Sequence, residues 1–301
     1  MENAPTLLAD VGGTNTRLAV YWQGQIVAGS TMHYANARMD SFESVVAMYL
    51  AHRGGTRPNS LCVAIAGPVT GRSGALTNGA WRFDADVLQG QLGFDDVQVI
   101  NDLAALGYAL PALPTEAVQR IGGGAAQDGQ ALVVGVATGF NVSLSADGRV
   151  FQAELGHASL PVRVMQILKT ELGAAAPEFQ TVEQCFSGPG LAKIHTLLCG
   201  VQAEPAAITR GCDPASQATK ALFARALGVF CREMIYQYLP LGGLYFNGSL
   251  ARAILGQDVA EIVVQEAGKD AAFAGRFGEI PLYLITDDTA ALYGCARYIS
   301  G

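Results

Sequence analysis

Short apolar runs alternate with amphipathic stretches along the first third of the chain. Residues 40–53 place apolar side chains three and four positions apart, which predicts a helix capped by Asp40 with Glu43 in a capping box. Residues 103–110 predict a second, more apolar helix. The expected strands cover residues 7–9, 17–22, 25–27, 61–66 and 97–100. Strands that alternate with helices indicate an α/β fold.

The opening pattern returns in the middle of the chain. Strands expected at 131–134, 142–144 and 149–151 repeat the strand, loop, strand and turn of the start, about 125 positions later. Helices follow at 162–172, 190–199, 216–238 and 289–298, with strands at 241–246 and 281–285. Two similar halves predict a two-lobed protein with a central cleft.

Composition and charge exclude several classes of protein. Half of the 301 residues are hydrophobic, which is too many for a disordered chain. A net charge of −7 disfavours nucleic-acid binding, and no apolar run reaches the roughly 18 residues of a membrane span. The first residues lack the positive charge of a secretory leader. Six scattered cysteines without a C-x-x-C pair indicate reduced thiols in a cytoplasmic protein, with no zinc site.

The strongest local motif is Asp10-Val-Gly-Gly-Thr-Asn-Thr16. Gly12 and Gly13 let the backbone N–H groups approach an anion, while Thr14 and Asn15 add side-chain donors. Asp10 at the strand end is suited to hold Mg²⁺, directly or through water. A hairpin turn with an aspartate capping the loop explains the same residues without a ligand. The repeated loop at 135–141 offers a second set of groups, so that two loops are expected to clamp one polyphosphate.

Asn101 and Asp102 lie where a strand meets a helix. Ligands of α/β sheets bind outside the carboxyl ends of strands, and a carboxylate there suits a general base that accepts a proton from a hydroxyl. The spacing alone favours a helix N-cap.

Glu154, His157 and Glu183 are polar residues near glycines. They suit hydrogen bonds to adjacent hydroxyls of a polyol, and equally a metal pair or a solvated loop, although no further histidine or cysteine completes a metal site. Gly242 and Gly248 are suited to turns at strand ends, or to a flat surface against a nucleotide base. Turns are the safer interpretation.

Taken together, these pieces resemble the bacterial glucokinase family, and the resemblance covers nearly the whole chain in family order. The cysteine-rich zinc motif of the related repressor and kinase group is absent. The matching segments are Asp10–Arg17, Ala64–Gly71, Thr77-Asn78 with Trp81, Ile100–Asp102, Glu154–His157, Ser187–Leu191 and Pro281–Ile285.

The resemblance implies an actin-like, ribonuclease-H-like α/β ATPase fold. It also implies transfer of the γ-phosphoryl group of ATP, with Mg²⁺, to the 6-hydroxyl of glucose, the first step of glycolysis. Asp102 would be the base. The sugar would be bound by Asn78, Asn101, Glu154, His157 and Glu183. The nucleotide would be bound by Asp10, Gly12, Gly13, Thr14, Asn15, Thr138, Gly139, Gly242 and Gly248.

Three ligand loops depart from the family pattern. Ala137 and Asn141 replace two glycines of the second phosphate loop, and Leu155 replaces a glycine beside the sugar. The adenosine turn ends in Ser249 where the family has glycine. A slow enzyme, a kinase for another hexose or an N-acetylhexosamine, and a sugar-binding regulatory protein with little catalysis therefore stay open.

The resemblance also sets expectations for domains and partners. The small domain is expected to comprise residues 1–106 and the helix at 287–301, and the large domain residues 107–286. A cytoplasmic homodimer is expected, with no nucleic-acid or membrane partner. The preferred hexose, and the choice among ATP, ADP and polyphosphate as donor, are not fixed by the sequence.

Overall fold

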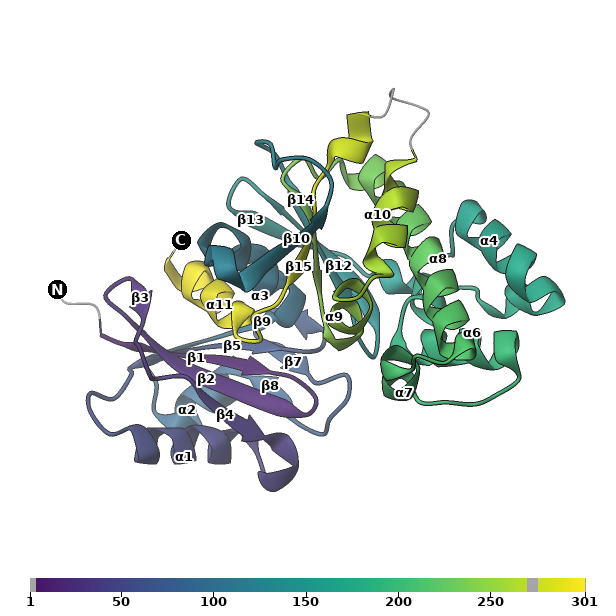
Figure 1. Cartoon of the computed structure of the whole chain (residues 1–301). Helices are drawn as coiled ribbons and strands as arrows, with labels where there is room; N and C mark the ends of the chain where they lie inside the picture. Colours follow the sequence, from purple (N-terminus) through teal and green to yellow (C-terminus); the bar gives the residue numbers. More distant parts are fainter. Residues whose placement is uncertain (1–3, 270–275, 301) are drawn as a thin grey trace. The chain divides into compact units, whose positions relative to one another are not determined.

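The computed structural model describes residues 4–269 and 276–300. The chain forms two compact units (Figure 1). Unit 1 comprises Met1–Leu113 and Asp288–Gly301, and unit 2 comprises Pro114–Asp287.

Unit 1 is built on a mixed sheet in which β1 lies between an antiparallel β2 and a parallel β5. The strand order is β3-β2-β1-β5-β9, and β4 also pairs with β2. A small antiparallel sheet holds β6, β7 and β8. The strands are β1 (Thr6–Val11), β2 (Asn15–Trp22), β3 (Gln25–Ile26), β4 (Met32–Ala35), β5 (Ser60–Ile65), β6 (Val69–Thr70), β7 (Ser73–Ala75), β8 (Arg82–Asp84) and β9 (Asp96–Asn101).

The helices of unit 1 are α1 (Phe42–Arg53), α2 (Ala85–Leu92), α3 (Asp102–Ala109) and α11 (Ala290–Ser300). The last of these is the C-terminal helix, which packs on α3 and on β1 and β5 (Figure 1). Phe42, Val45, Val46 and Tyr49 of α1 are buried, as the helical periodicity predicted.

The start of α1 corrects the sequence prediction. Its N-cap is Ser41, whose Oγ accepts a hydrogen bond from the N–H of Ser44. Asp40 therefore lies one residue before the cap, and Glu43 stands in the first turn, where its negative charge suits the helix N-terminus. Both serine and aspartate are good N-caps, so the sequence alone did not fix which of two neighbours fills the position.

Unit 2 has a second mixed sheet, ordered β10-β15-β14-β11-β12-β13. Strand β11 pairs antiparallel with β12 and parallel with β14, which in turn pairs parallel with β15. The strands are β10 (Val118–Gly122), β11 (Ala131–Val136), β12 (Phe140–Ala146), β13 (Arg149–Gln152), β14 (Gly243–Asn247) and β15 (Leu282–Ile285).

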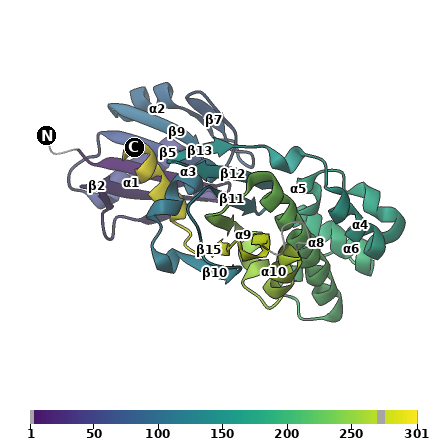
Figure 2. The ribbon, with the colours of Figure 1, turned by 90° about the horizontal axis from the view of Figure 1, so that it is seen from above.

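Figure 2 shows the longer helices of unit 2 grouped around α8, which contacts α4, α6, α7 and α10. The helices are α4 (Val162–Leu172), α5 (Val182–Cys185), α6 (Gly188–Cys199), α7 (Pro205–Arg210), α8 (Pro214–Tyr238), α9 (Ser249–Leu255) and α10 (Ala260–Gly268).

The internal repeat in the sequence is a repeat of sheet topology. In unit 1 the order β3-β2-β1-β5-β9 places an antiparallel hairpin beside parallel strands, and in unit 2 β13-β12-β11-β14-β15 does the same. Each first strand ends in a short loop before its hairpin partner. The two loops that the sequence singled out therefore occupy equivalent positions in their own sheets.

Each unit has its own hydrophobic core. The core of unit 2 contains a cluster of phenylalanines in which the rings of Phe186 and Phe230 stack at 5.0 Å between centroids. Phe140 joins both rings and is 3% exposed, so the first residue of β12 is anchored in the core. This anchor fixes the loop that precedes it.

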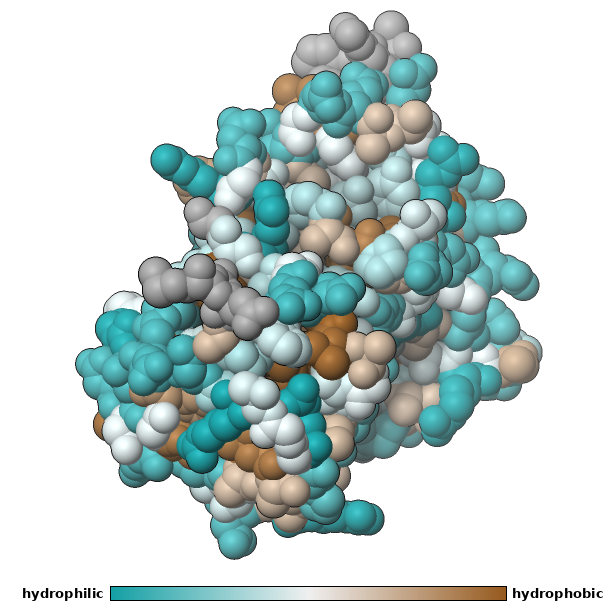
Figure 3. Space-filling view, turned by 90° about the vertical axis from the view of Figure 1, so that its left-hand side faces the viewer, coloured by the Kyte–Doolittle hydropathy of each residue, from teal (hydrophilic) through white to brown (hydrophobic). Residues whose placement is uncertain are grey.

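The surface is mainly polar. Figure 3 shows hydrophilic residues over most of the face that it presents, with hydrophobic residues in small groups among them. No helix within residues 4–269 and 276–300 has both the length and the hydrophobicity required to cross a bilayer.

Gly294 gives a test of the packing in unit 1. A methyl group at this position would overlap with the carbonyl oxygen of Ala105, because α11 lies directly against α3. Gly294→Ala is expected to lower the free energy of unfolding by about 2–3 kcal/mol, measured by urea titration.

The matched control is Gly90→Ala, because Gly90 is exposed on helix α2 and has open space around it. It is expected to leave stability unchanged or to raise it by about 0.5–1 kcal/mol, since alanine favours helix. Equal effects of the two substitutions would contradict the close packing of α11 on α3.

Candidate active site

The first predicted ligand loop joins β1 to β2 in unit 1. The N–H of Gly12 donates to the carbonyl of Asn15 at 2.9 Å, which closes the turn. Asn36 supports it from the following segment: its Nδ2 donates to the carbonyl of Gly12, and its Oδ1 accepts from Thr16 Oγ1, both at 2.8 Å. Thr14 and Asn15 are exposed. The motif did not indicate Asn36, because this residue lies outside it.

Gly13 brings this loop against another predicted site residue. A methyl group on Gly13 would lie 2.8 Å from the carbonyl oxygen of Asn78. Asn78 is exposed on the segment between β7 and β8. A predicted nucleotide residue and a predicted sugar residue are thus direct neighbours, and glycine is required for the approach.

Asp10 lies near the end of β1 and is 9% exposed. Its Oδ2 pairs with Arg17 Nη1 at 3.0 Å across the β1–β2 hairpin, and Arg17 also reaches Asp288 at 3.9 Å. Burial raises the pKa of Asp10, and the charge of Arg17 opposes that effect. The ion pair offsets part of the cost of burying this carboxylate.

Asn101 and Asp102 stand at the junction of β9 and α3, and Asn101 is the N-cap that the spacing favoured. Its Oδ1 accepts from the N–H of Ala104 at 3.1 Å, and its Nδ2 donates to the carbonyl of Gly67 and to Asp102 Oδ1. Asp102 Oδ1 also accepts from the N–H of Leu103 at 2.9 Å. Both of these hydrogen bonds to the Asp102 carboxylate end on Oδ1.

Two effects raise the pKa of Asp102 to about 7: burial, and then the negative charge of Asp10. Its hydrogen bonds act in the opposite direction. A carboxylate with such a pKa is half protonated near neutral pH, and a base whose pKa lies near the working pH is effective in proton transfer. Asp102 is therefore equipped to accept a proton, and Asp10 is part of the reason.

The second predicted ligand loop joins β11 to β12 in unit 2. The N–H of Ala137 donates to the carbonyl of Gly139 at 3.0 Å, and the carbonyl of Ala137 accepts from Gly188 at 2.8 Å. Gly188 is the first residue of the 12-residue helix α6, so a helix N-terminus lies beside the loop. Exposed Thr138 stands at its tip. Backbone N–H groups and a helix dipole together favour an anion here.

Gly248 lies against the same loop. It has a φ of 111°, and a side chain there would clash with the carbonyl of Val136, so only glycine fits. Gly242 lies at the opposite end of β14, beside Gly129, Gln130 and Ala131. One strand length separates the two glycines, and parallel-sheet ligands bind at the carboxyl end. This position removes Gly242 from the candidate site.

The departures from the family pattern create no backbone strain. Among the described residues, the non-glycine residues with left-handed φ are Gln23, Asp147 and Leu239. Ala137 and Asn141 therefore adopt a backbone conformation that any residue accepts. The side chain of Leu155 packs against the hydrophobic core of unit 2. An apolar side chain gains free energy from such burial, and the position of Leu155 beside the sugar stays a prediction.

Glu183 connects the second loop to the predicted sugar residues. It lies in the first turn of α5, and its Oε2 accepts from the N–H of Phe140 at 3.0 Å. A methyl group on Gly139 would lie 2.5 Å from the same oxygen. Glu154 precedes a short 3₁₀ turn, His157 is the last residue of that turn, and both are exposed. Asn141 on β12 donates to Glu154 Oε2 at 2.8 Å. Glu183 and Glu154 therefore both accept hydrogen bonds from the first two residues of β12.

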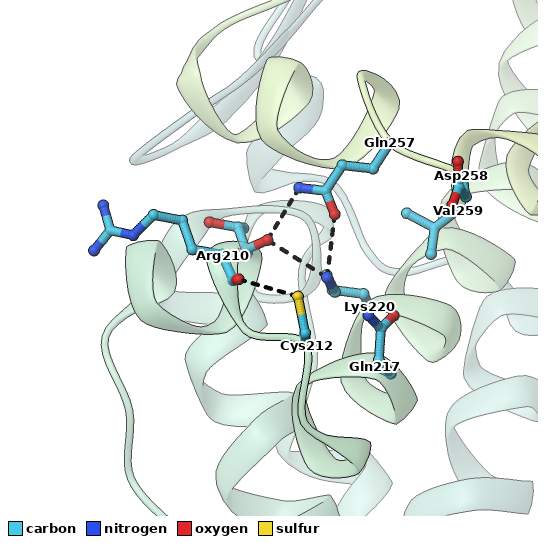
Figure 4. Close-up of a pocket in the computed structure, with 8 residues that line it drawn as sticks. Arg210, Cys212, Gln217, Lys220, Gln257, Asp258 and Val259 are labelled. Atoms are coloured by element: carbon cyan, nitrogen blue, oxygen red, sulfur yellow. Dashed lines mark hydrogen bonds between the residues drawn. The ribbon is translucent and has the colours of Figure 1, made fainter.

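A cavity of about 390 Å³ lies elsewhere in unit 2, at the end of α7 (Figure 4). None of the predicted site residues lines it. Buried Lys220 donates to the carbonyl of Gly211 at 2.9 Å, to Gln257 Oε1 at 3.1 Å and to the carbonyl of Thr209 at 3.5 Å. Figure 4 shows Arg210 directed away from this group. The ammonium joins the end of α7 to the segment after α9, which is a structural role.

Comparison with known proteins adds independent information. A family model described as glucokinase matches residues 7–301. Glucokinase of Tolumonas auensis is 31% identical, over 97% of this chain and 96% of its own. The crystal structure of glucokinase from an Antarctic psychrotroph is 26% identical with a TM-score of 0.79, covering 99% of both chains.

A more distant structure is that of a ROK family glucokinase from Streptomyces griseus in complex with glucose and AMPPNP. It has 17% identity and a TM-score of 0.67, and the match covers 99% of this chain and 100% of the other. These likenesses confirm the predicted α/β sugar-kinase fold.

The elevated pKa of Asp102 is directly measurable by carboxyl ¹³C NMR titration. We expect a midpoint near 7 in the wild-type protein. Asp10→Asn removes the second cause of the shift, so the midpoint should fall while burial keeps it above the usual value of about 4. An unchanged midpoint in Asp10→Asn would show that the two carboxylates are not coupled.

Proposed function

The chain belongs to the glucokinase family, and we propose that it transfers the γ-phosphoryl group of ATP to the 6-hydroxyl of glucose. The observation that carries this proposal is the carboxylate of Asp102, which is partly buried at the carboxyl end of β9 and is held through Oδ1 by Asn101 and Leu103. Whole-length similarity to named glucokinases supports the choice of substrate.

In the proposed reaction the oxygen of the sugar hydroxyl forms a bond to the γ-phosphorus. The bond from that phosphorus to the β–γ bridging oxygen breaks, and ADP leaves with the electron pair. Asp102 Oδ2 accepts the hydroxyl proton as the new bond forms. The products are glucose 6-phosphate, ADP and a proton that Asp102 later returns to water.

The remaining residues have binding roles in this proposal. Asn78 and Asn101 of unit 1, and Glu154, His157 and Glu183 of unit 2, would hydrogen-bond the other hydroxyls. A site built from such groups discriminates against sugars that lack one of the hydroxyls, since its own polar atoms would then be left unpaired.

The phosphates would be bound by Gly12, Gly13, Thr14 and Asn15 of unit 1, and by Thr138 and Gly139 of unit 2. Gly248 would lie near the adenosine. The N-terminus of α6 beside Ala137 supports the placement of negative charge at the second loop.

Mg²⁺ would accompany the nucleotide. No group of three or more histidine, cysteine, aspartate or glutamate side chains suited to a metal occurs among the described residues. Mg²⁺ bound to a nucleotide commonly keeps waters and takes only one or two carboxylates, so this is no obstacle. Asp10 fits the role, because its buried carboxylate adds to the negative charge around Asp102 and Arg17 occupies only one of its oxygens. The ion would neutralise charge on the phosphates.

The structure bears on the alternative of a sugar-binding protein with little catalysis. That alternative rested on Ala137, Asn141 and Leu155, and none of these residues has a left-handed backbone conformation. The polar neighbours that Asp102 has within its own unit, Asn101 and Asp10, support an active kinase. A cytoplasmic homodimer remains part of the proposal and rests on the family resemblance.

Asp102→Asn tests the proposal through turnover. The amide keeps the shape of the carboxylate but does not accept the proton, so kcat should fall by about 10²–10⁴. Glucose affinity by calorimetry should stay within about tenfold, because the hydrogen-bonding shape is retained. A coupled assay for ADP release measures kcat.

Asp96→Asn is the control, since Asp96 is exposed at the other end of β9. It should turn over glucose at the wild-type rate. Full activity in Asp102→Asn would exclude Asp102 as the base, and a wild-type protein that binds glucose but releases no ADP would exclude kinase activity.

A further inference from the structure

Asn141 uses both ends of its side-chain amide. Its Oδ1 accepts from the backbone N–H of Val142 at 2.9 Å and from that of Leu155 at 3.0 Å. Its Nδ2 donates to Glu154 Oε2 at 2.8 Å. The residue lies on β12 opposite Gly135 of β11. One side chain therefore connects the end of the second ligand loop to the segment that carries Glu154.

These contacts act on Glu154 from two directions. The bond from Leu155 N–H holds the backbone immediately after Glu154, and the apolar side chain of Leu155 is packed against the core of unit 2. The bond from Nδ2 holds the carboxylate itself. An exposed glutamate otherwise samples many rotamers, and ordering such a side chain on ligand binding costs free energy. The bond from Asn141 reduces this freedom before any ligand binds, and it ends on Oε2 of the two carboxylate oxygens.

A glycine at position 141 would supply none of these bonds. The asparagine adopts an ordinary backbone conformation, so it gains the contacts without strain. The presence of Leu155 is compatible with this arrangement, because its backbone N–H and its side chain face different partners. The two departures from the family pattern thus form one connected structure around Glu154.

We propose that Asn141 is a positioning residue that holds the carboxylate of Glu154 in the orientation that binds a hydroxyl of the hexose. The proposal rests on the proposed function, in which Glu154 contacts the sugar. It assigns to Asn141 an effect on sugar affinity and on discrimination among sugars, and little effect on the phosphoryl-transfer step.

Asn141→Asp separates this role from a structural one. The aspartate keeps an oxygen that accepts from Val142 and Leu155, so the fold should keep its melting temperature. It replaces the donor to Glu154 by a negative charge, which repels the carboxylate. Glucose binding, measured by isothermal titration calorimetry without nucleotide, should weaken by about tenfold or more, since a charge-assisted hydrogen bond is lost. The KM for glucose should rise in parallel, while kcat stays within about threefold.

The double variant Asn141→Asp with Glu154→Gln provides the rescue. The new glutamine donates to the new aspartate, which restores the hydrogen bond with its direction reversed, and its oxygen still faces the sugar. Its glucose affinity should exceed that of Asn141→Asp alone. Ser145→Asp is the matched control, because it adds the same charge to β12 at a position that pairs with Ala131 and Val150. It should bind glucose as the wild-type protein does.

Wild-type affinity in Asn141→Asp would overturn the positioning role, as would an equal loss in Ser145→Asp. A double variant that binds no better than Asn141→Asp, together with a lowered melting temperature, would also overturn it by indicating a structural effect. A wild-type protein that binds no glucose would instead overturn the proposed function, and the inference would fall with it. Glucose binding by the wild-type protein therefore separates the two failures.

Discussion

A carboxylate held at the end of a buried strand is the constraint on which the rest of the site depends. Burial makes the ionised form of Asp102 expensive, and the nearby charge of Asp10 makes it more so. The N-cap Asn101 and the N–H of Leu103 hold Oδ1 of this carboxylate in place. The same three elements, a strand end, a helix start and a neighbouring carboxylate, give the side chain both its position and its affinity for a proton.

The sheet of unit 2 has the same topology as the sheet of unit 1, but different functional groups stand beside its first loop. Its first loop has no aspartate at the position equivalent to Asp10, where Gly135 stands. The loop itself offers backbone N–H groups, and the N-terminus of α6 lies beside it. Glu183 and Glu154 accept hydrogen bonds from Phe140 and Asn141, the first two residues of β12. Phe140, the residue that follows this loop, is packed among the aromatic rings of the core. In the proposed reaction, the sheet of unit 1 supplies the base, and the sheet of unit 2 supplies donors and acceptors for ligands.

The sequence predicted the parts that local physics determines. Apolar periodicity predicted helices and strands, and the repeated loop predicted two similar halves. The dipeptide Asn101-Asp102 indicated both the helix cap and the candidate base. What it missed depends on contacts between distant residues. Asn36 supports the first loop from 24 positions away, and Asn141 meets Glu154 only because β12 passes beside it. The packing of the Leu155 side chain on the core depends on tertiary structure, and the distance between Gly242 and Gly248 depends on the length of β14. Neither can be read from a motif.

The central claim is that Asp102 accepts the proton of the sugar hydroxyl, and the pH dependence of kcat/KM for glucose tests it most directly. Only the ionised carboxylate acts as the base, so kcat/KM should fall below pH 7 by about tenfold for each pH unit, with a midpoint at the pKa of about 7. A profile that stays flat from neutral pH down to about pH 5, in a protein that remains folded there, would contradict Asp102 as the base.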